Sequence, residues 1–394
     1  MSSLLETLTK LTPARRASIA PFIAMDVKRE ATLMEQAGER IIHMEVGEPC
    51  APPPRRVREA AIAALGGGPI GYTDALGLYA LRQRIARHYA ETYGQDIDPR
   101  RVAITTGSSG GFIMAFLALF DIGARVAISC PGYPAYRNIF SALGVETVDV
   151  PVHAENGFAL TAAALKKAHA EQKLDGVLAM SPANPTGAML TDAQLRDIAL
   201  FCESEGVKFI SDEIYHGLTF THPAQTALAF SDQAIVVNSF SKYYCMTGWR
   251  IGWLVAPPEL IRPIERLQQS LAISAPTLSQ IAAQAAFDSR DELEAVKEGY
   301  RRNREILLDG LPDLGFSALA PADGAFYLYA DISRFTGDST RFCHDLLHRA
   351  GVAATPGVDF DPTLGHLSLR LSYAGAEADM VEALRRLRDF LALR

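Results

Sequence analysis

Seven short apolar runs between residues 102 and 256 constrain the fold of this chain more than any other feature. They are VAITT (102–106), RVAIS (125–129), ETVDV (146–150), GVLAM (176–180), VKFIS (207–211), AIVVN (234–238) and IGWLVA (251–256). Runs of this length are typical of buried strands. Helix-like stretches separate several of them, and strands that alternate with helices pair in parallel. The sequence therefore predicts an α/β fold, a three-layer sandwich around a mostly parallel seven-stranded sheet.

One of the intervening stretches, TDAQLRDIALFCESEG (191–206), carries both the start and the stop signal of a helix. Thr191 is a favoured N-cap residue, and Gln194 three residues later completes a capping box. Gly206 suits the left-handed position that ends a helix. A second stretch, GGFIMAFLALF (110–120), is apolar enough to predict a largely buried helix.

The pattern changes after the seventh run. A long helical pattern (292–311) is followed by GAFYLYADI (324–332), a helix near 339–350, a short strand at 366–373 and a closing helix at 376–393. These elements predict a smaller α+β domain. We therefore divide the chain into an N-terminal segment of the small domain (1–46), a large ligand-binding domain (47–290) and a small C-terminal domain (291–394).

Composition excludes several classes of function. The net charge is −7 and no block of Lys or Arg stands out, which argues against nucleic-acid binding. The five cysteines are scattered and lack the spacing of a zinc site, so we expect reduced thiols, no metal and a cytoplasmic protein. No segment has the length and apolarity of a membrane span or a signal peptide.

Lys242 lies in SFSKYYCMTGWR (239–250), directly after a predicted core strand. A lysine at a strand end can extend its ammonium into solvent. Alternatively, its amine is held in a cleft, partly desolvated and nucleophilic, where it forms a Schiff base with a carbonyl compound. The neighbouring residues decide between these two interpretations.

Asp212 and Tyr215 follow another predicted strand, in VKFISDEIYHG (207–217), and Asn184 follows a third, in SPANPTG (181–187). Asp212 either caps the next helix or provides a fixed anion that keeps a pyridine nitrogen protonated. Tyr215 is either an amphipathic residue at the edge of the core or a phenol donor to a ring oxygen. Asn184 belongs to an Asn-Pro-Thr-Gly sequence that is typical of a turn, and its side chain also offers an amide N–H at a strand end.

TTGSSGG (105–111) opens a predicted helix and offers N–H groups and hydroxyls to an anion. It matches neither the P-loop nor the dinucleotide-binding pattern. Arg250, Ser239 and Ser241 would complete a phosphate site beside Lys242.

Two further residues point to a flat, carboxylate-bearing ligand. Tyr133, in CPGYPAY (130–136), follows a strand and could stack on an aromatic ring. Arg370 interrupts the apolar strand HLSLRLSY (366–373), and a buried arginine needs an anion. That anion is either a structural carboxylate of the protein or the carboxylate of a substrate, which the guanidinium grips with two parallel hydrogen bonds.

Taken together, these residues supply the parts that a pyridoxal phosphate site needs. In sheets of this kind the ligand binds at the carboxyl ends of the strands, where most of them lie. The chain resembles the class I/II aminotransferases, the aspartate-aminotransferase-like group of fold type I pyridoxal phosphate enzymes. The motifs that carry the resemblance are GEP (47–49), GYTDALGLYALR (71–82), TTGSSG, NPTG (184–187), SDEIY (211–215), SFSKYYCMTGWRIGW (239–253), GAFY (324–327) and RLSYA (370–374).

The resemblance implies a role for each matching residue. It implies that Lys242 forms the Schiff base with pyridoxal 5'-phosphate and moves the substrate proton, with Asp212 on the pyridine nitrogen. It implies that Asn184 and Tyr215 contact the ring oxygen and that Tyr133 stacks on the ring. It implies that the phosphate is bound by Ser108, Ser109, Ser239, Ser241 and Arg250, and that Tyr72 contacts the phosphate bound in a neighbouring subunit. It also implies that the substrate carboxylate is bound by Arg370, Asn184 and the Gly47 backbone. One departure is GEPC in place of the family's usual GEPD.

The activity that the resemblance implies is transfer of an amino group from an L-amino acid to a 2-oxo acid, 2-oxoglutarate, by a ping-pong mechanism in a homodimer with shared sites. One alternative is a lyase or decarboxylase of the same fold type, since the same cofactor site can break another bond at Cα. Consumption of 2-oxo acid without release of ammonia would distinguish transamination.

A second alternative is a non-enzymatic regulator, but these carry an added DNA-binding module for which the chain has no room. Apolar residues expected near the site (Phe22, Ile23, Tyr72 and Ile273) either favour a neutral or aromatic amino donor or serve the packing of the core or of a dimer.

Overall fold

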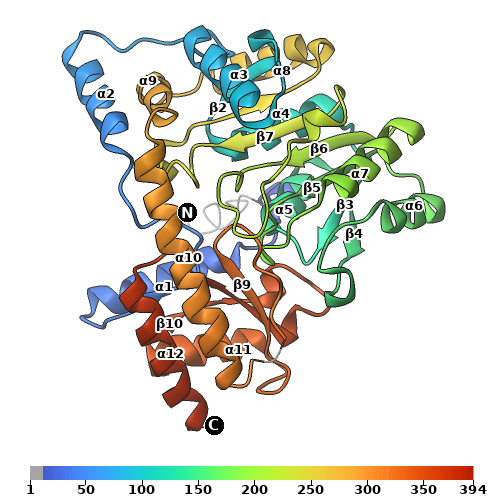
Figure 1. The fold of residues 1–394 in the computed structure, drawn as a ribbon. Helices are drawn as coiled ribbons and strands as arrows, with labels where there is room; N and C mark the ends of the chain where they lie inside the picture. The colour runs from blue at the N-terminus through green and yellow to red at the C-terminus, as the bar shows by residue number, and fades with distance from the viewer. Residues whose placement is uncertain (1–11, 317, 394) are drawn as a thin grey trace, which may run out of the picture.

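The computed structural model describes residues 12–316 and 318–393 (Figure 1). The predicted N-terminal segment (1–46) is therefore described only from Thr12 onward. Among the residues described, no helix is long and apolar enough to cross a membrane.

A seven-stranded sheet forms the upper half of the molecule in the view of Figure 1. All seven predicted runs are its strands: β2 (Val102–Thr105), β3 (Arg125–Cys130), β4 (Glu146–Pro151), β5 (Gly176–Met180), β6 (Lys208–Asp212), β7 (Ile235–Ser239) and β8 (Gly252–Val255). Their order is β2-β8-β7-β6-β5-β3-β4, and β8 alone runs antiparallel to its neighbours. The mostly parallel sheet predicted from the sequence is confirmed.

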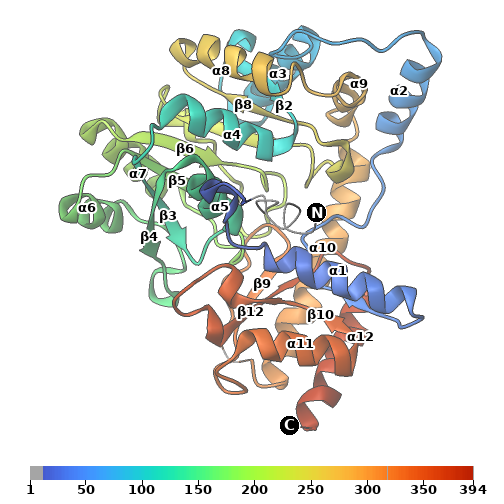
Figure 2. The same cartoon turned by 180° about the vertical axis from the view of Figure 1, so that it is seen from behind.

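Helices cover both faces of this sheet, as the two opposite views show (Figures 1 and 2). Buried residues on one face come from α4 (Gly107–Leu119), α5 (Pro134–Leu143) and α8 (Pro258–Leu271). Buried residues on the other face come from α2 (Arg55–Gly66), α3 (Tyr79–Tyr93), α6 (Ala162–Glu171), α7 (Asp192–Glu205) and α9 (Thr277–Ala286). The central strands are buried on both faces, which explains why they are continuous apolar runs.

The local signals that predicted α7 are present in the structure. Thr191 accepts a hydrogen bond from the Gln194 N–H, the Gln194 side chain reaches back to the Thr191 N–H, and Gly206 takes the left-handed conformation. These contacts satisfy backbone groups that the ends of a helix leave unpaired.

A second, smaller body lies below the sheet in Figure 1 and has its own apolar core. Its three-stranded antiparallel sheet has the order β11-β12-β9, and β1 pairs with β10 beside it. Its elements are β1 (Ile42–His43), β9 (Tyr327–Asp331), β10 (Val352–Ala353), β11 (Thr355–Pro356), β12 (Ser368–Ser372), α1 (Ile23–Gln36), α10 (Arg290–Asp313), α11 (Ser339–Ala350) and α12 (Glu377–Ala392).

Replacing Thr191 with Ala should lower the free energy of unfolding by about 1 kcal/mol, because α7 loses its N-cap hydrogen bond. Denaturant titration followed by circular dichroism measures this loss. Thr221→Ala is the control, since Thr221 is exposed and starts no helix. Equal effects of the two substitutions would contradict the capping argument.

Candidate active site

A cavity of about 520 Å³ opens at the carboxyl ends of the sheet strands, between the sheet and the smaller body. The predicted site residues that line it are Gly47, Ser108, Ser109, Tyr133, Asn184, Asp212, Tyr215, Ser241, Lys242, Arg250 and Arg370. Ser108, Tyr133, Asn184, Asp212 and Lys242 end or follow different strands of the large sheet, whose order brings them to one edge, and Arg370 of the smaller body and Gly47, after β1, approach from the other side.

Lys242 is partly buried at this cavity, where its Nζ donates a hydrogen bond to the Gly47 carbonyl at 2.7 Å. Burial, and then the positive charge of Arg370, lower the pKa of Lys242 to about 8. The negative charges of Glu48 and Asp212 oppose this shift. An amine with this pKa is neutral in a useful fraction of molecules near neutral pH, and the neutral amine is the nucleophile.

Asp212, the last residue of β6, is only 1% exposed. Burial raises the pKa of its carboxyl to about 6, while hydrogen bonds from the Tyr136 hydroxyl and the Ile214 N–H limit the rise. Asp212 is therefore mostly ionised at neutral pH, although it lies in the interior. Sequence reasoning missed Tyr136, whose position three residues after Tyr133 places both on the same side of the start of α5.

Tyr215 pairs its hydroxyl with that of Tyr327 on β9 at 2.6 Å, which joins the two bodies of the molecule at the cavity. The Tyr327 ring also lies against Gly47, where a Cβ atom would fall 1.7 Å from the Tyr327 hydroxyl oxygen. Only glycine fits at position 47. Tyr327 was given no role from the sequence, and its presence in GAFY (324–327) was the only signal.

Arg370, on β12, is 2% exposed and lies between the rings of Tyr327 and Phe360, 4.4 and 4.7 Å from their centres. Its guanidinium donates to the Asn184 Oδ1 at 2.9 Å and to the carbonyl of Glu45, and its Nε has no partner. Among the described residues no carboxylate pairs with it. Of the two anions considered from the sequence, this arrangement favours a bound carboxylate over a structural acid.

The first turn of α4 and Arg250 form the cationic end of the cavity. Gly107 has φ +70°, and a Cβ atom there would lie 2.5 Å from the Arg250 Nη2, so the guanidinium is packed directly against this turn. Arg250 Nη1 is fixed by the Thr247 carbonyl at 2.9 Å. The N–H groups at the start of α4, the hydroxyls of Ser108 and Ser109, and this guanidinium suit an anion such as a phosphate.

Two predicted site residues do not line the cavity. Ser239 is 1% exposed, and its hydroxyl hydrogen-bonds Ser241 at 2.8 Å and the Ile251 carbonyl at 3.0 Å, so it supports Ser241 from behind. Tyr72 is 82% exposed, in the segment between α2 and α3.

Helix α1 contributes a wall of the cavity through Phe22, Ala24, Met25 and Lys28, which lie at its start and in its first turns. Among the described residues, Phe22 is the only one of the four apolar residues expected near the site that lines the cavity. Ile273 does not line it and is 50% exposed. Lys28, which sequence reasoning missed, forms an ion pair with Glu48 at 2.8 Å.

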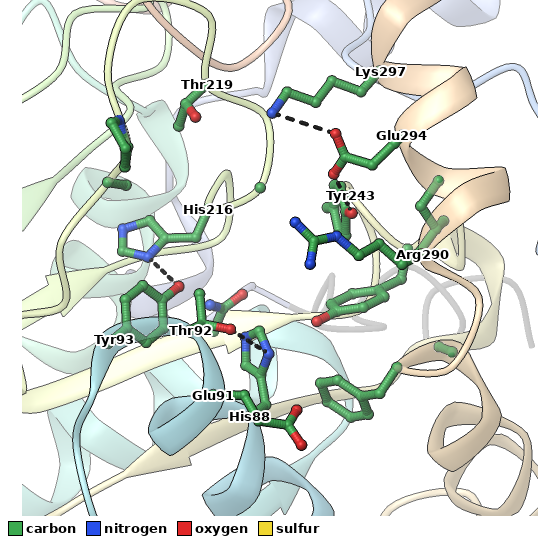
Figure 3. A pocket seen from close by; sticks show the side chains of 18 of the residues that line it. His88, Glu91, Thr92, Tyr93, His216, Thr219, Tyr243, Arg290, Glu294 and Lys297 are labelled. Carbon is green, nitrogen blue, oxygen red and sulfur yellow. Dashed lines mark hydrogen bonds and ion pairs between the residues drawn. The ribbon is translucent and has the colours of Figure 1, made fainter.

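A second cavity, of about 640 Å³, is lined by side chains that include Tyr93, His216, Tyr243 and Glu294, and none of the predicted site residues lines it (Figure 3). Tyr93 hydrogen-bonds the His216 Nδ1 at 2.8 Å, and the Tyr243 hydroxyl donates to Glu294 at 2.6 Å. Burial lowers the pKa of His216 to about 3, so this histidine is neutral at neutral pH. These contacts hold the segment that follows Asp212 and the residue after Lys242 in place.

Comparisons with known proteins agree with this geometry. Residues 39–387 match the family described as aminotransferase class I and II. A valine–pyruvate aminotransferase of Mycobacterium tuberculosis is 47% identical, and the match covers 96% of this chain and 98% of that protein. An arginine–pyruvate transaminase of Pseudomonas aeruginosa is 36% identical over 92% of this chain and 93% of its own length.

Two solved structures show the same fold. The crystal structure of an aminotransferase from Mycobacterium tuberculosis has a TM-score of 0.95 and 46% identity, and it covers 98% of this chain and 100% of its own. An aspartate aminotransferase from Thermus thermophilus with maleate has a TM-score of 0.92 and 30% identity, and it covers 97% of this chain and 100% of its own.

The Lys242 amine should react with acetic anhydride at a rate that rises with pH and levels off above about 8, because only the neutral amine is a nucleophile. Competitive labelling of the apoenzyme, followed by mass spectrometry of the Lys242 peptide, measures the midpoint. Lys173, which is exposed, is the internal reference. A midpoint for Lys242 equal to that of Lys173 would contradict its partial desolvation.

Proposed function

Because this chain belongs to the class I and II aminotransferases, we propose that the cavity lined by Lys242 binds pyridoxal 5'-phosphate and transfers an amino group from an L-amino acid to a 2-oxo acid. The proposal rests on one observation: the desolvated amine of Lys242 and the buried, mostly ionised carboxylate of Asp212 lie in one cavity with an anion site.

The donors present fit this cofactor. The turn at Ser108 and Ser109, with Ser241 and Arg250, would hold the phosphate, and Ser239 would support Ser241. Asp212 would face the pyridine nitrogen, and Tyr133 would stack on the ring. Asn184 and Tyr215 would hold the ring oxygen. The bound cofactor supplies an electron-withdrawing ring that makes the substrate Cα–H acidic.

The chain's own residues then position the substrate and move one proton. Arg370 would bind the α-carboxylate with two parallel hydrogen bonds, with the Asn184 amide and the Gly47 backbone beside it. Lys242 would hold the cofactor through its amine, and the same amine would act as the base that removes the Cα proton and as the acid that returns it. Because the first product leaves before the second substrate enters, the kinetics are ping-pong.

We propose a neutral L-amino acid as donor and 2-oxoglutarate as acceptor, with pyruvate as a second acceptor. The relative that is 47% identical is named for valine and pyruvate, which supports a small neutral pair. The apolar part of the wall, Phe22, Met25 and Phe112, suits such a side chain. Lys28 is the remaining cation among the described cavity residues, and the distal carboxylate of 2-oxoglutarate would replace Glu48 as its partner.

A homodimer with shared sites is also part of the proposal. Thr277 donates to the Gly71 carbonyl at 2.6 Å, so the segment with Tyr72 runs beside the start of α9. Leu271, the last residue of α8, and Ile273, between α8 and α9, are 57% and 50% exposed. Exposed apolar side chains beside an exposed tyrosine suit an interface between two copies.

Division into a cofactor-binding domain (47–290) and a small domain (1–46 and 291–394) remains our proposal, supported by two main apolar cores that meet where Ile214, Tyr215 and Leu218 pack into the core of the smaller body. A cytoplasmic location is supported by the cysteines, all of which are free.

A half-reaction screen of amino acids tests the activity directly. The holoenzyme is mixed with single L-amino acids, and the loss of cofactor absorbance is followed without any acceptor. Valine and other neutral amino acids should convert the cofactor fastest, and pyruvate or 2-oxoglutarate should restore the absorbance. Release of ammonia in place of this reversal would contradict transamination.

Replacing Lys242 with Ala should reduce steady-state turnover by at least about a thousandfold, because the proton-transfer group is lost. Steady-state assays with the best donor and acceptor measure the effect. Lys173→Ala, at an exposed lysine, is the control and should retain full activity. Full activity in Lys242→Ala would overturn the assignment.

Subunit complementation tests the role of Tyr72. Dimers formed by mixing Lys242→Ala subunits with Tyr72→Ala subunits should regain up to about a quarter of the wild-type activity, since half of the dimers contain one complete site. Activity after unfolding and refolding of the two together is compared with each alone. No gain on mixing would mean that Tyr72 does not serve the site of its neighbour.

A further inference from the structure

We propose that Glu30, His344 and His348 form a binding site for a divalent transition-metal cation of the zinc class, which ties α1 to α11. Neither the proposed transaminase activity nor its cofactor requires this site. It lies on the smaller body, where both helices pack against β10 and β11 (Figure 2).

The two histidines are one helical turn apart on α11, at positions i and i+4, and therefore share a face of the helix. Their ring centres are 4.3 Å apart. Glu30 comes from α1, and its Oε1 lies 2.8 Å from the His348 Nε2. The two helices are thus already joined through two of the three side chains, Glu30 and His348.

One ligand atom from each residue lies within 4.8 Å of the others. Ligands of a tetrahedral zinc ion, at about 2.0–2.2 Å from the metal, are separated by about 3.3–3.5 Å. The side chains of His344, His348 and Glu30 are 58%, 39% and 44% exposed, so small rotations can close the difference. Their exposure also leaves a fourth position for water.

The donor set selects the kind of ion. Two imidazoles and one carboxylate suit Zn²⁺, Ni²⁺ or Cu²⁺, whereas Ca²⁺ and Mg²⁺ prefer oxygen ligands alone. The Asp345 carboxylate lies 3.8 Å from the His344 Nδ1, on the side where an outer carboxylate commonly orients a metal-binding imidazole. This leaves Nε2 of His344 as the coordinating atom.

Metal binding would hold the half of α1 that is farther from the candidate active site against α11. The start of α1 is already held by Asp359, whose carboxylate accepts from the N–H groups of Ile23 and Ala24 at 3.1 and 3.2 Å. Because the first turns of α1 form a wall of the Lys242 cavity, an ion at Glu30 would restrain that wall from its other end. An ion that binds the folded chain only also stabilises it by mass action.

The test uses the holoenzyme carrying Cys50→Ser, which removes the one exposed cysteine as a competing ligand. Titration with Zn²⁺ alone in a calorimeter should give one site per chain, and the midpoint of thermal unfolding should rise by about 2–4 °C at saturating Zn²⁺. His344→Ala, His348→Ala and Glu30→Gln should each weaken Zn²⁺ binding at least about tenfold. The control His366→Ala, at an exposed histidine elsewhere, should leave binding unchanged.

Each variant is compared with itself in the presence and absence of Zn²⁺, so a loss of basal stability does not affect the comparison. Cu²⁺ bound to the parent should show coupling to two imidazole nitrogens by electron paramagnetic resonance, and to one in His344→Ala. Unchanged Zn²⁺ affinity in the His344→Ala/His348→Ala double variant, or no binding in the parent, would overturn the proposal.

Discussion

The partial burial of one amine is the constraint on which the candidate site depends. Lys242 is removed from most of its water, hydrogen-bonded to the Gly47 carbonyl and placed near the positive charge of Arg370, so its ammonium form is disfavoured. Asp212 provides the opposing charge from inside the sheet and is kept mostly ionised by Tyr136 and a backbone N–H. The reactivity proposed for Lys242 is therefore a property of this balance of charges.

Close backbone packing fixes the geometry around that amine. Gly107 and Gly252 let the first turn of α4 approach Arg250 and β8 more closely than any side chain would allow. Gly47 does the same for Tyr327, whose hydroxyl meets Tyr215 across the boundary between the two bodies. The cavity is thus built from both bodies, and a change in their relative position would alter the groups around Lys242.

Much of the fold follows from the sequence because its signals are local. The strands of the large sheet are continuous apolar runs, and α7 carries its capping box and its terminal glycine within one stretch. The site residues after those strands were predictable for the same reason, since parallel order sends the ends of the strands to one edge. Tyr136 and Tyr327 were missed because their roles arise from contacts with residues 76 and 112 positions away.

The sequence alone determined the chemistry available: a lysine, an aspartate and an anion-binding turn that follow predicted strands, and an arginine inside another. Only the tertiary structure decided how those groups act. Arg370 has no acidic partner among the described residues, Ser239 lies behind the cavity wall, and Tyr72 is exposed to solvent. The reason is physical: the chemical identity of each side chain is read directly from the sequence. Its desolvation, charge balance and accessibility depend instead on which distant parts of the chain pack against it.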